Sequence, residues 1–244
     1  MRIAIVSDIH GNLFALEAVL EDLKQTAPDS IYHGGDLVHA GANPAAVVDR
    51  IRDLGWPGVA GNTDEMMFRP ESLTDYAKGA PKLQSLWTVL EEMAAAEREM
   101  LDAAQLAWLA ALPRVQLDTP MALVHASPES LWRAPMPEAS DADLESVYGP
   151  LGRPVAVYAH IHRSYIRRSY VRNVAGMTVV NTGSVSMSHD GDRRASYLLL
   201  DDTTPVIRRV EYDVDKEIRA LAISGIPHAD WVSKILVSAT PQMP

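Results

Sequence analysis

Residues 1–11 read Met-Arg-Ile-Ala-Ile-Val-Ser-Asp-Ile-His-Gly, and this stretch decides the fold. The apolar run from Ile3 to Val6 predicts a buried strand, and Asp8 and His10 follow it directly. A helix that packs on this strand is predicted next by leucines at helical spacing, Leu13, Leu16, Leu20 and Leu23. The chain therefore begins with a strand, a polar turn and a helix.

The same unit recurs immediately. The sequence predicts a strand at Ile31-Tyr32-His33, a tight turn at Gly34-Gly35-Asp36, a helix from Ala45 to Leu54, and then the strand Val59-Ala60 and the turn Gly61-Asn62. Alternating strands and helices predict an α/β fold with a largely parallel sheet. Polar turns after the strands lie where such sheets place their ligand sites.

The rest of the chain predicts a helical insert followed by more strands. Apolar residues recur at helical spacing between about 64 and 112, which predicts a small helical cap. Further strands are expected at Ala122–Val124, Val155–Tyr158, Thr178–Val180, Ser196–Leu200 and Val206–Val210, and helices near Asp215–Ile223 and His228–Val237. No linker divides the chain, so we expect one domain over residues 1–244.

The composition fits this organisation and narrows the chemistry. With 244 residues, of which 47% are hydrophobic, the chain is long enough for one domain with a large core. A formal net charge of −10 opposes binding to duplex nucleic acid, because that affinity comes mainly from Lys and Arg that neutralise phosphates. The chain has no cysteine, which excludes thiolate metal sites and cysteine nucleophiles.

The sequence also predicts a cytoplasmic protein without a membrane segment. The first apolar run ends at Asp8, well short of the hydrophobic stretch that a signal peptide needs. No later run approaches the roughly 20 apolar residues that span a bilayer.

Seven side chains with metal-binding chemistry follow the predicted strands. Asp8 and His10 are two residues apart, as are His160 and His162, so an extended backbone would point both members of each pair to one side. Taken singly, each is more often a hydrogen-bonded core or loop residue than a ligand. Their shared position is the informative feature, because it gives one sheet edge the nitrogen and oxygen ligands of transition metals: Asp8, His10, Asp36, Asn62, His125, His160 and His162.

This ordered set resembles the calcineurin-like metallophosphoesterase superfamily. The motifs that carry the resemblance span nearly the whole chain: Asp8-Ile-His10, Gly35-Asp36, Gly61-Asn62-Thr63-Asp64, His125 and His160-Ile-His162. The turn Asn181-Thr182-Gly183-Ser184-Val185 is similar to one in the small prokaryotic phosphodiesterase branch.

The resemblance implies a fold and a metal centre. The fold would be a four-layer α/β sandwich of two mixed β-sheets flanked by helices. One ion would be held by Asp8, His10, Asp36 and His162, and the other by Asp36, Asn62, His125 and His160, so that Asp36 bridges them. Histidine-rich ligation without sulfur argues against Ca²⁺ and Mg²⁺ and leaves Mn²⁺, Fe or Zn²⁺, of which the resemblance favours Mn²⁺.

The implied activity is hydrolysis of a phosphodiester or nucleotide-type phosphate in a small substrate, with metal-bound hydroxide as the nucleophile and Asp36 and Asn62 in the catalytic centre. Two divalent ions would bring four positive charges, of which Asp8, Asp36 and a bridging hydroxide would neutralise three. One positive charge then remains to attract an anionic phosphate, despite the acidic composition of the chain.

One position departs from the family pattern. Many members have a histidine directly after the asparagine, where it contacts the phosphate or protonates the leaving oxygen, but this chain has Thr63. A threonine hydroxyl can donate a hydrogen bond to substrate but cannot act as a general acid near pH 7. Alkyl monoesters should therefore be poor substrates, and a phosphodiesterase is expected rather than a monoesterase. His39 is the candidate for a substitute acid or a substrate contact, and a solvated loop histidine is the alternative.

The environments of three further residues can also be predicted. Arg163, beside the histidine pair, could bind substrate phosphate through two hydrogen bonds, or it could form a surface salt bridge. His33 lies within a strand and is expected to be buried with its hydrogen bonds satisfied. His189 lies in a polar loop and is expected to be exposed.

Two alternatives share this fold. A nuclease of the same superfamily is disfavoured by the acidic composition and by the lack of a stripe rich in Lys and Arg. A non-catalytic interaction module, like the scaffold subunit of retromer, is disfavoured because every metal-ligand position of the family carries a residue that can bind metal. The sequence leaves the oligomeric state open.

Overall fold

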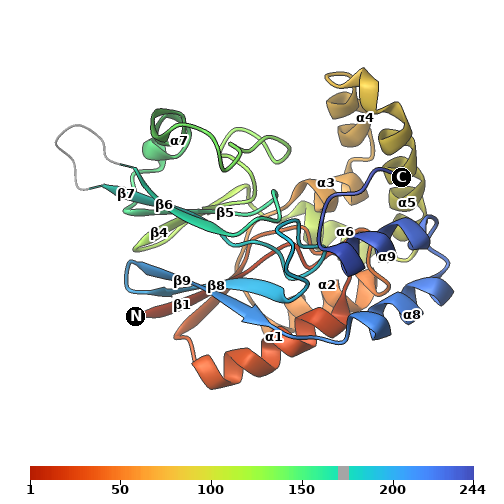
Figure 1. Cartoon of the computed structure of the whole chain (residues 1–244), viewed down its shortest axis with the longest axis horizontal. Coiled ribbons are helices and arrows are strands. Elements are labelled where there is room, and N and C mark those ends of the chain that lie inside the picture. Colours follow the sequence, from red (N-terminus) through yellow and green to blue (C-terminus); the bar gives the residue numbers. More distant parts are fainter. Residues whose placement is uncertain (170–175) are drawn as a thin grey trace.

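The computed structural model of the chain describes residues 1–169 and 176–244, and for residues 166–169 it describes the backbone alone. Two mixed β-sheets lie face to face at the centre, and helices cover their outer faces (Figure 1). The α/β sandwich expected from the sequence is confirmed.

The first sheet has the strand order β2-β1-β8-β9. Its strands are β1 (Arg2–Val6), β2 (Ser30–His33), β8 (Ala195–Asp201) and β9 (Thr204–Val210). β1 pairs with β2 in parallel, and the other two pairs are antiparallel. The strand expected at Val59-Ala60 is not formed, which corrects the prediction. Gly58 makes only a single bridge to His33, and the chain then leaves the sheet as the Ala60 N–H donates to the carbonyl of Pro113.

The second sheet has the order β3-β4-β5-β7-β6, with three parallel central strands and an antiparallel strand at each edge. Its strands are β3 (Val115–Leu117), β4 (Met121–Val124), β5 (Val155–Tyr158), β6 (Tyr165–Ser169) and β7 (Met177–Asn181). The two edge strands were not predicted. β3 is only three residues long, and β6 reads Tyr-Ile-Arg-Arg-Ser, which lacks an apolar run.

The side chains of β1 alternate between two cores. Ile3 and Ile5 face the second sheet, where they pack with apolar residues such as Leu123 and Val157. Ala4 and Val6 point to the other face, toward the helices. Because both faces of β1 are buried, the strand fixes the two sheets and the helix layer relative to one another.

Helices form the outer layers. α1 (Leu13–Thr26) and α2 (Pro44–Leu54) cover the first sheet, and α7 (Asp141–Tyr148) covers the second (Figure 1). α7 was not predicted, because only Leu144 and Tyr148 of its residues are buried and the apolar pattern is sparse.

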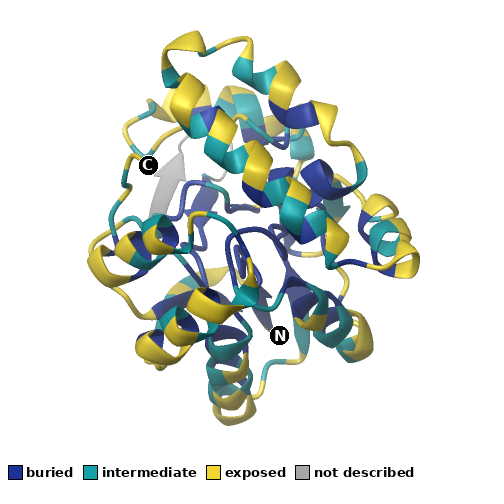
Figure 2. Ribbon diagram, turned by 90° about the vertical axis from the view of Figure 1, so that its right-hand side faces the viewer, coloured by how far each residue is buried: buried dark blue, intermediate teal, exposed yellow. Residues whose placement is uncertain are grey.

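The remaining helices gather at one end of the sandwich (Figure 1). They are α3 (Asn62–Phe68), α4 (Glu71–Ala77), α5 (Gln84–Glu99), α6 (Ala103–Ala110), α8 (Val214–Ser224) and α9 (Ala229–Ser238). Single 3₁₀ turns lie at Pro81–Leu83 and Gly149–Leu151. Figure 2 shows buried strands and loops inside a shell of helices whose outer faces are exposed. Within the described ranges, no helix combines the length and apolar character needed to cross a membrane.

Candidate metal centre

The loops after β1 and β2 run side by side and carry three of the predicted donors. The backbone N–H groups of Asp8 and His10 donate to the carbonyls of Gly35 and Asp36, each at 3.0 Å. The backbone is not extended here, which corrects the prediction: φ is +54° at Asp8, +51° at His10 and +53° at Asp36. Asp and His tolerate this left-handed region better than most residues. The side chains meet because left-handed turns direct them, and not because a strand alternates.

The loop after β5 repeats this backbone. His160 and His162 have φ values of +67° and +54°, so the expectation of an extended pair is wrong here too. The His160 N–H donates to Asp8 Oδ1 at 3.2 Å, which joins this loop to the end of β1. His125 follows β4 directly, and its carbonyl accepts the N–H of Ala159 at 2.8 Å. The two sheets therefore deliver their loops to one place.

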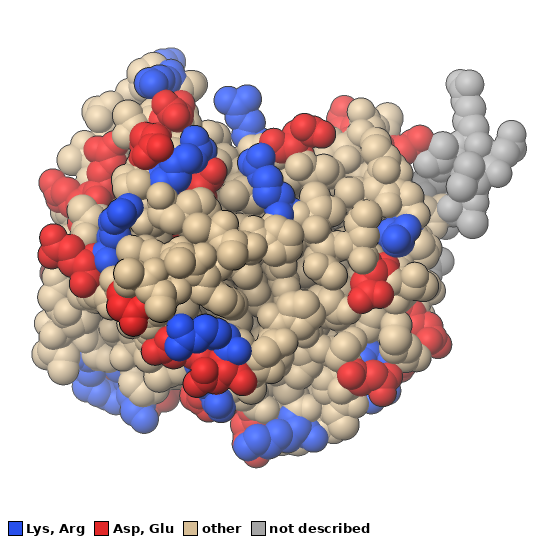
Figure 3. All heavy atoms as spheres, turned by 180° about the vertical axis from the view of Figure 1, so that it is seen from behind, with Lys and Arg blue, Asp and Glu red and all other residues tan. Residues whose placement is uncertain are grey.

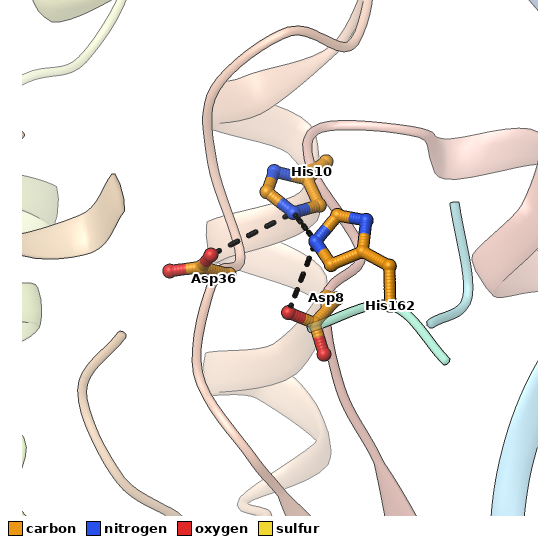
Figure 4. A group of neighbouring side chains, drawn as sticks. All are labelled: Asp8, His10, Asp36 and His162. Atoms are coloured by element: carbon orange, nitrogen blue, oxygen red, sulfur yellow. Dashed lines mark hydrogen bonds and ion pairs between the residues drawn. The ribbon is translucent and has the colours of Figure 1, made fainter. Parts of the chain in front are cut away.

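Four side chains form the first donor group, which Figure 4 shows: Asp8, His10, Asp36 and His162. Each offers one ligand atom, and these atoms lie within 4.8 Å of one another. His10 Nε2 is 3.0 Å from His162 Nε2 and 3.6 Å from Asp36 Oδ2. His162 Nε2 is 3.4 Å from Asp8 Oδ1. All four residues are buried, and their ligand atoms lie next to one another.

A second donor group shares Asp36 with the first. It contains Asp36, His125 and His160, again within 4.8 Å. Asp36 Oδ2 lies 3.4 Å from His125 Nε2. Asn62 Oδ1 completes the group at 3.0 Å from His125 Nε2 and 2.8 Å from His160 Nδ1. The structure thus brings together all seven side chains that the sequence singled out as donors.

Three histidines are held by the ring nitrogen that faces away from the centre. Nδ1 lies 3.1 Å from the His39 carbonyl in His10, 2.8 Å from the Gly34 carbonyl in His125, and 2.7 Å from the Met187 carbonyl in His162. A proton on Nδ1 donates to each carbonyl and leaves the Nε2 lone pair directed at the other donors. Metal-binding histidines are oriented in this way.

The charges of the group also suit a cation. Burial lowers the pKa values of His10 and His160 to about 4, so both are neutral at pH 7, the form that binds metal. Burial also acts to lower the pKa of His125, but the Asp36 carboxylate outweighs it and raises that pKa to about 9. In turn, burial acts to raise the pKa of Asp36, and the charge of His125 keeps it below the usual range. A bound divalent ion would supply the positive charge beside Asp36 that the His125 proton supplies in its absence.

Asp64 supports the centre without belonging to it. Its carboxylate accepts the backbone N–H groups of Asp36, Leu37 and Gly61, each at 2.9 Å. Burial and then the charge of Asp36 raise the pKa of Asp64 to about 6. The sequence showed Asp64 within the Gly-Asn-Thr-Asp motif but gave it no role. Its contacts with Asp36 and Leu37 are long-range, and the sequence gave no sign of them, whereas its contact with Gly61 lies within the motif.

The loop beyond Asp36 is pinned by two buried carboxylates. Glu97 of α5 lies 2.7 Å from His39 Nδ1 and accepts the N–H of Ala40 at 2.6 Å. Glu217 of α8 accepts the N–H of Ala42 at 2.8 Å through Oε1. Burial raises the pKa of Glu217 to about 7, and its Oε2 has no hydrogen-bond partner among the described atoms. His39 is therefore a buried, carboxylate-paired residue, and its interpretation as a solvated loop histidine is wrong.

The two predicted substrate contacts, Thr63 and Arg163, lie in different places relative to the donors. Thr63 lines the same cavity as the donors, its hydroxyl donates to the Val38 carbonyl at 2.9 Å, and its N–H donates to Asp36 Oδ1 at 2.9 Å. Arg163 is half-buried directly after His162, and it is not among the described residues that line this cavity.

Two other histidines differ from expectation. His189 stacks on His162 with ring centroids 4.7 Å apart and lines the cavity, and burial lowers its pKa to about 2, so the prediction of an exposed side chain is wrong. Its polar neighbours in the sequence gave no sign of this packing. His33 is buried as predicted, but neither ring nitrogen has a partner among the described atoms, so the expected hydrogen bonds are not made.

Comparison with known proteins assigns the family. Residues 1–204 match the calcineurin-like phosphoesterase superfamily domain. The chain belongs to the calcineurin-like phosphoesterase superfamily. It is 30% identical over 253 aligned residues to the uncharacterized protein MJ0912 of Methanocaldococcus jannaschii, and the alignment covers 96% of each chain.

Two solved structures have the same fold along their whole length. A metallophosphoesterase from Sphaerobacter thermophilus superposes with a TM-score of 0.78 at 26% identity, covering 98% of this chain and 99% of that one. The protein PH1004 from Pyrococcus horikoshii superposes with a TM-score of 0.80 at 20% identity, covering 99% of each. As a calcineurin-like phosphoesterase, the chain is a phosphoester hydrolase with a buried Asp/His cluster that could bind metal.

Proposed function

We propose that this calcineurin-like phosphoesterase is a dinuclear-metal-dependent phosphodiesterase that acts on a small phosphorylated substrate. One divalent transition-metal ion would be held by Asp8, His10, Asp36 and His162, and the other by Asp36, Asn62, His125 and His160. Mn²⁺ is the ion we expect, with Fe and Zn²⁺ as alternatives. The observation that carries the proposal is that Asp36 belongs to both donor groups, with Oδ2 3.6 Å from His10 Nε2 and 3.4 Å from His125 Nε2.

When bound, such ions would supply an activated water and offset the charge of the phosphoryl oxygens. The protein's own residues orient the donors and exclude solvent. The Asn62 amide oxygen lies between His125 and His160, and backbone carbonyls hold the rings of His10, His125 and His162. Six of the seven donors are buried and His160 is half-buried, and this low exposure strengthens the electrostatic interactions of the group.

We assign the proton for the leaving oxygen to His39. Thr63 cannot supply one at neutral pH, and its hydroxyl is already engaged with the Val38 carbonyl. His39 lines the cavity, Glu97 accepts from its Nδ1, and its Nε2 has no partner among the described atoms. Nε2 is therefore the ring nitrogen that is left for proton transfer.

The surface argues against a duplex nucleic acid as substrate. Among the residues that are described on the face shown in Figure 3, lysines and arginines are interspersed with aspartates and glutamates and form no basic stripe. Arginines of the described surface also pair with acids, as Arg50 does with Glu17 and Arg194 with Asp192. Nucleic-acid binding needs phosphate-neutralising charge that is free of such partners.

The test uses metal-stripped protein reloaded with Mn²⁺, Fe²⁺ or Zn²⁺. We expect elemental analysis to give about two ions per chain, and hydrolysis of bis(4-nitrophenyl) phosphate to return with the metal. Turnover of 4-nitrophenyl phosphate should be slower, because the proposed activity is that of a diesterase. A reloaded protein that hydrolyses neither ester would contradict the proposal. Faster hydrolysis of the monoester than of the diester would overturn the assignment as a phosphodiesterase.

A further inference from the structure

The donor groups open into a cavity of about 330 Å³ whose remaining lining is mostly apolar. Leu86 and Leu90 of α5 line one part of the cavity, and Trp231 and Ile235 of α9 line another part. The segment 241–243, which follows α9, lines the cavity as well. Figure 1 shows this terminal segment running between α9 and the helices of the 62–110 region.

The segment after α9 is held in place by hydrogen bonds. Trp231 Nε1 donates to the Gln242 carbonyl at 3.1 Å. The Gln242 side chain donates to Ser238 Oγ at 3.2 Å and to Thr240 Oγ1 at 2.9 Å. The Gly191 N–H donates to the Ala239 carbonyl at 2.9 Å. This wall is therefore a formed part of the structure against which a ligand can pack.

The cavity is uncharged beyond the donors. Of the described residues that line it, none is a lysine or an arginine. Three polar side chains outside the donor set make hydrogen bonds to the protein: Thr63 to Val38, His39 to Glu97 and Gln242 to Ser238. A second or third phosphate group would lose its hydration here and find no cation in return.

We infer that the organic part of the substrate is an uncharged aromatic or branched aliphatic group that packs between Leu86, Leu90 and Trp231, on a phosphodiester that carries a single negative charge. This rests on the proposed function, because the donor groups must bind the phosphate for the walls to meet the organic part. A polyphosphate should bind weakly, because the same walls offer no cation to its additional charges. The single positive charge left by two ions, two aspartates and a hydroxide matches one phosphodiester anion.

The test compares ligands of equal charge and different apolar area. Diphenyl phosphate and dimethyl phosphate both carry one negative charge, and their binding to Mn²⁺-loaded protein is measured by calorimetry. We expect diphenyl phosphate to bind at least about tenfold more tightly, since even one methylene in an apolar pocket is worth about tenfold. A dinucleoside tetraphosphate, which has aromatic groups and several charges, should bind more weakly than diphenyl phosphate.

Variants of the wall locate the effect. Leu90→Ala should reduce the preference for diphenyl phosphate, and Leu90→Lys should reduce it further while improving the tetraphosphate. Trp231→Ala removes both the aromatic ring and its hydrogen bond to residue 242, whereas Trp231→Phe removes the hydrogen bond but keeps a smaller aromatic ring, so the pair helps to separate ring contact from anchoring. Val237→Ala is the matched control, because Val237 lies on α9 but is 53% exposed and outside the cavity.

The outcomes separate this inference from the proposed function. Equal affinities for the two diesters, or a tighter tetraphosphate, would overturn the inference even if bis(4-nitrophenyl) phosphate is hydrolysed. A different result would be tight binding of diphenyl phosphate that becomes weaker in Leu90→Ala, together with no hydrolysis of any diester. That result would support the apolar site and refute the proposed hydrolase activity. An unchanged preference in both Leu90→Ala and Trp231→Ala would show that these walls do not contact the ligand.

Discussion

Asp64 accepts the backbone N–H of Asp36 at 2.9 Å, and so a carboxylate outside the donor groups fixes the one residue that both groups share. The same carboxylate accepts the N–H groups of Leu37 and Gly61. It ties the turn after β2 to the start of α3, which carries Asn62. Two donors from separate segments therefore depend on one buried side chain.

Replacing Asp64 by asparagine should weaken metal binding by about 10- to 100-fold, the usual cost of losing an outer partner of a metal ligand. An amide has one acceptor oxygen where the carboxylate uses both, so an NH₂ group would face a backbone N–H. Metal titration followed by calorimetry measures the effect. Asp53→Asn, at an exposed position on α2, is the control. Unaltered affinity in Asp64→Asn would show that these three hydrogen bonds do not position the donors.

Asp36→Asn should reduce the metal content from about two ions per chain and lower kcat by more than about 100-fold, because both proposed sites lose a charged ligand. The fold should persist, since the residue lies in a loop at the rim of the first sheet. Elemental analysis, hydrolysis of bis(4-nitrophenyl) phosphate and circular dichroism are measured together. If a folded Asp36→Asn protein still holds two ions and retains wild-type turnover, Asp36 does not bridge them.

The assignment of His39 as proton donor predicts a leaving-group effect. His39→Gln should lower kcat/KM for alkyl esters by about 100-fold and affect activated aryl esters little, because only a poor leaving group needs the proton. Adding Thr63→His to this variant should restore part of the loss for the alkyl esters. The measurement is the slope of log kcat/KM against leaving-group pKa in the three proteins. A uniform loss across all esters would mean that His39 supports the loop and does not transfer a proton.

The buried side chain of Glu217 should make the folded protein less stable as the pH rises. Its pKa is about 7 in the folded chain against 4.5 for the ordinary side chain, so the folded state holds its proton more tightly. The resulting stabilisation is fully present below pH 4.5 and is lost as the pH rises through 7. Between pH 5 and 8, the free energy of unfolding of the metal-free protein should fall on the order of 2 kcal/mol more than that of Glu217→Gln. Urea denaturation at both pH values measures this, and parallel curves for the two proteins would count against a buried, protonated Glu217.

The sequence predicted which residues meet but not how they meet. Donors such as Asp8 and His125 could be found because each follows a buried apolar run, and strands that share a sheet bring their ends to one edge. The left-handed backbone at Asp8, His10 and His160 could not be found, since it depends on hydrogen bonds between loops that are far apart in the sequence. For the same reason, the partnership of His39 with Glu97, 58 residues away, was not predicted.

The elements that were predicted wrongly have local sequences that explain the error. α7 buries only Leu144 and Tyr148, and β6 carries charged residues at an edge position. Val59 is fully buried and has strand propensity, but it lies in a segment that leaves the sheet for α3. Hydrophobic periodicity therefore identified β2 and β9 at the edges of the first sheet, but it missed β3 and β6, edge strands of the second sheet that lack an apolar run.

The donor groups draw on both sheets, since Asp8 and Asp36 follow strands of the first sheet and His125 and His160 follow strands of the second. Any ion bound to them acts as a crosslink between residues more than 100 positions apart in the chain. Such a link can form only after both halves have folded and docked, because neither half contains a complete set of donors. Metal uptake should therefore report the last step of assembly, and removing the ions should loosen the packing between the sheets before either sheet unfolds.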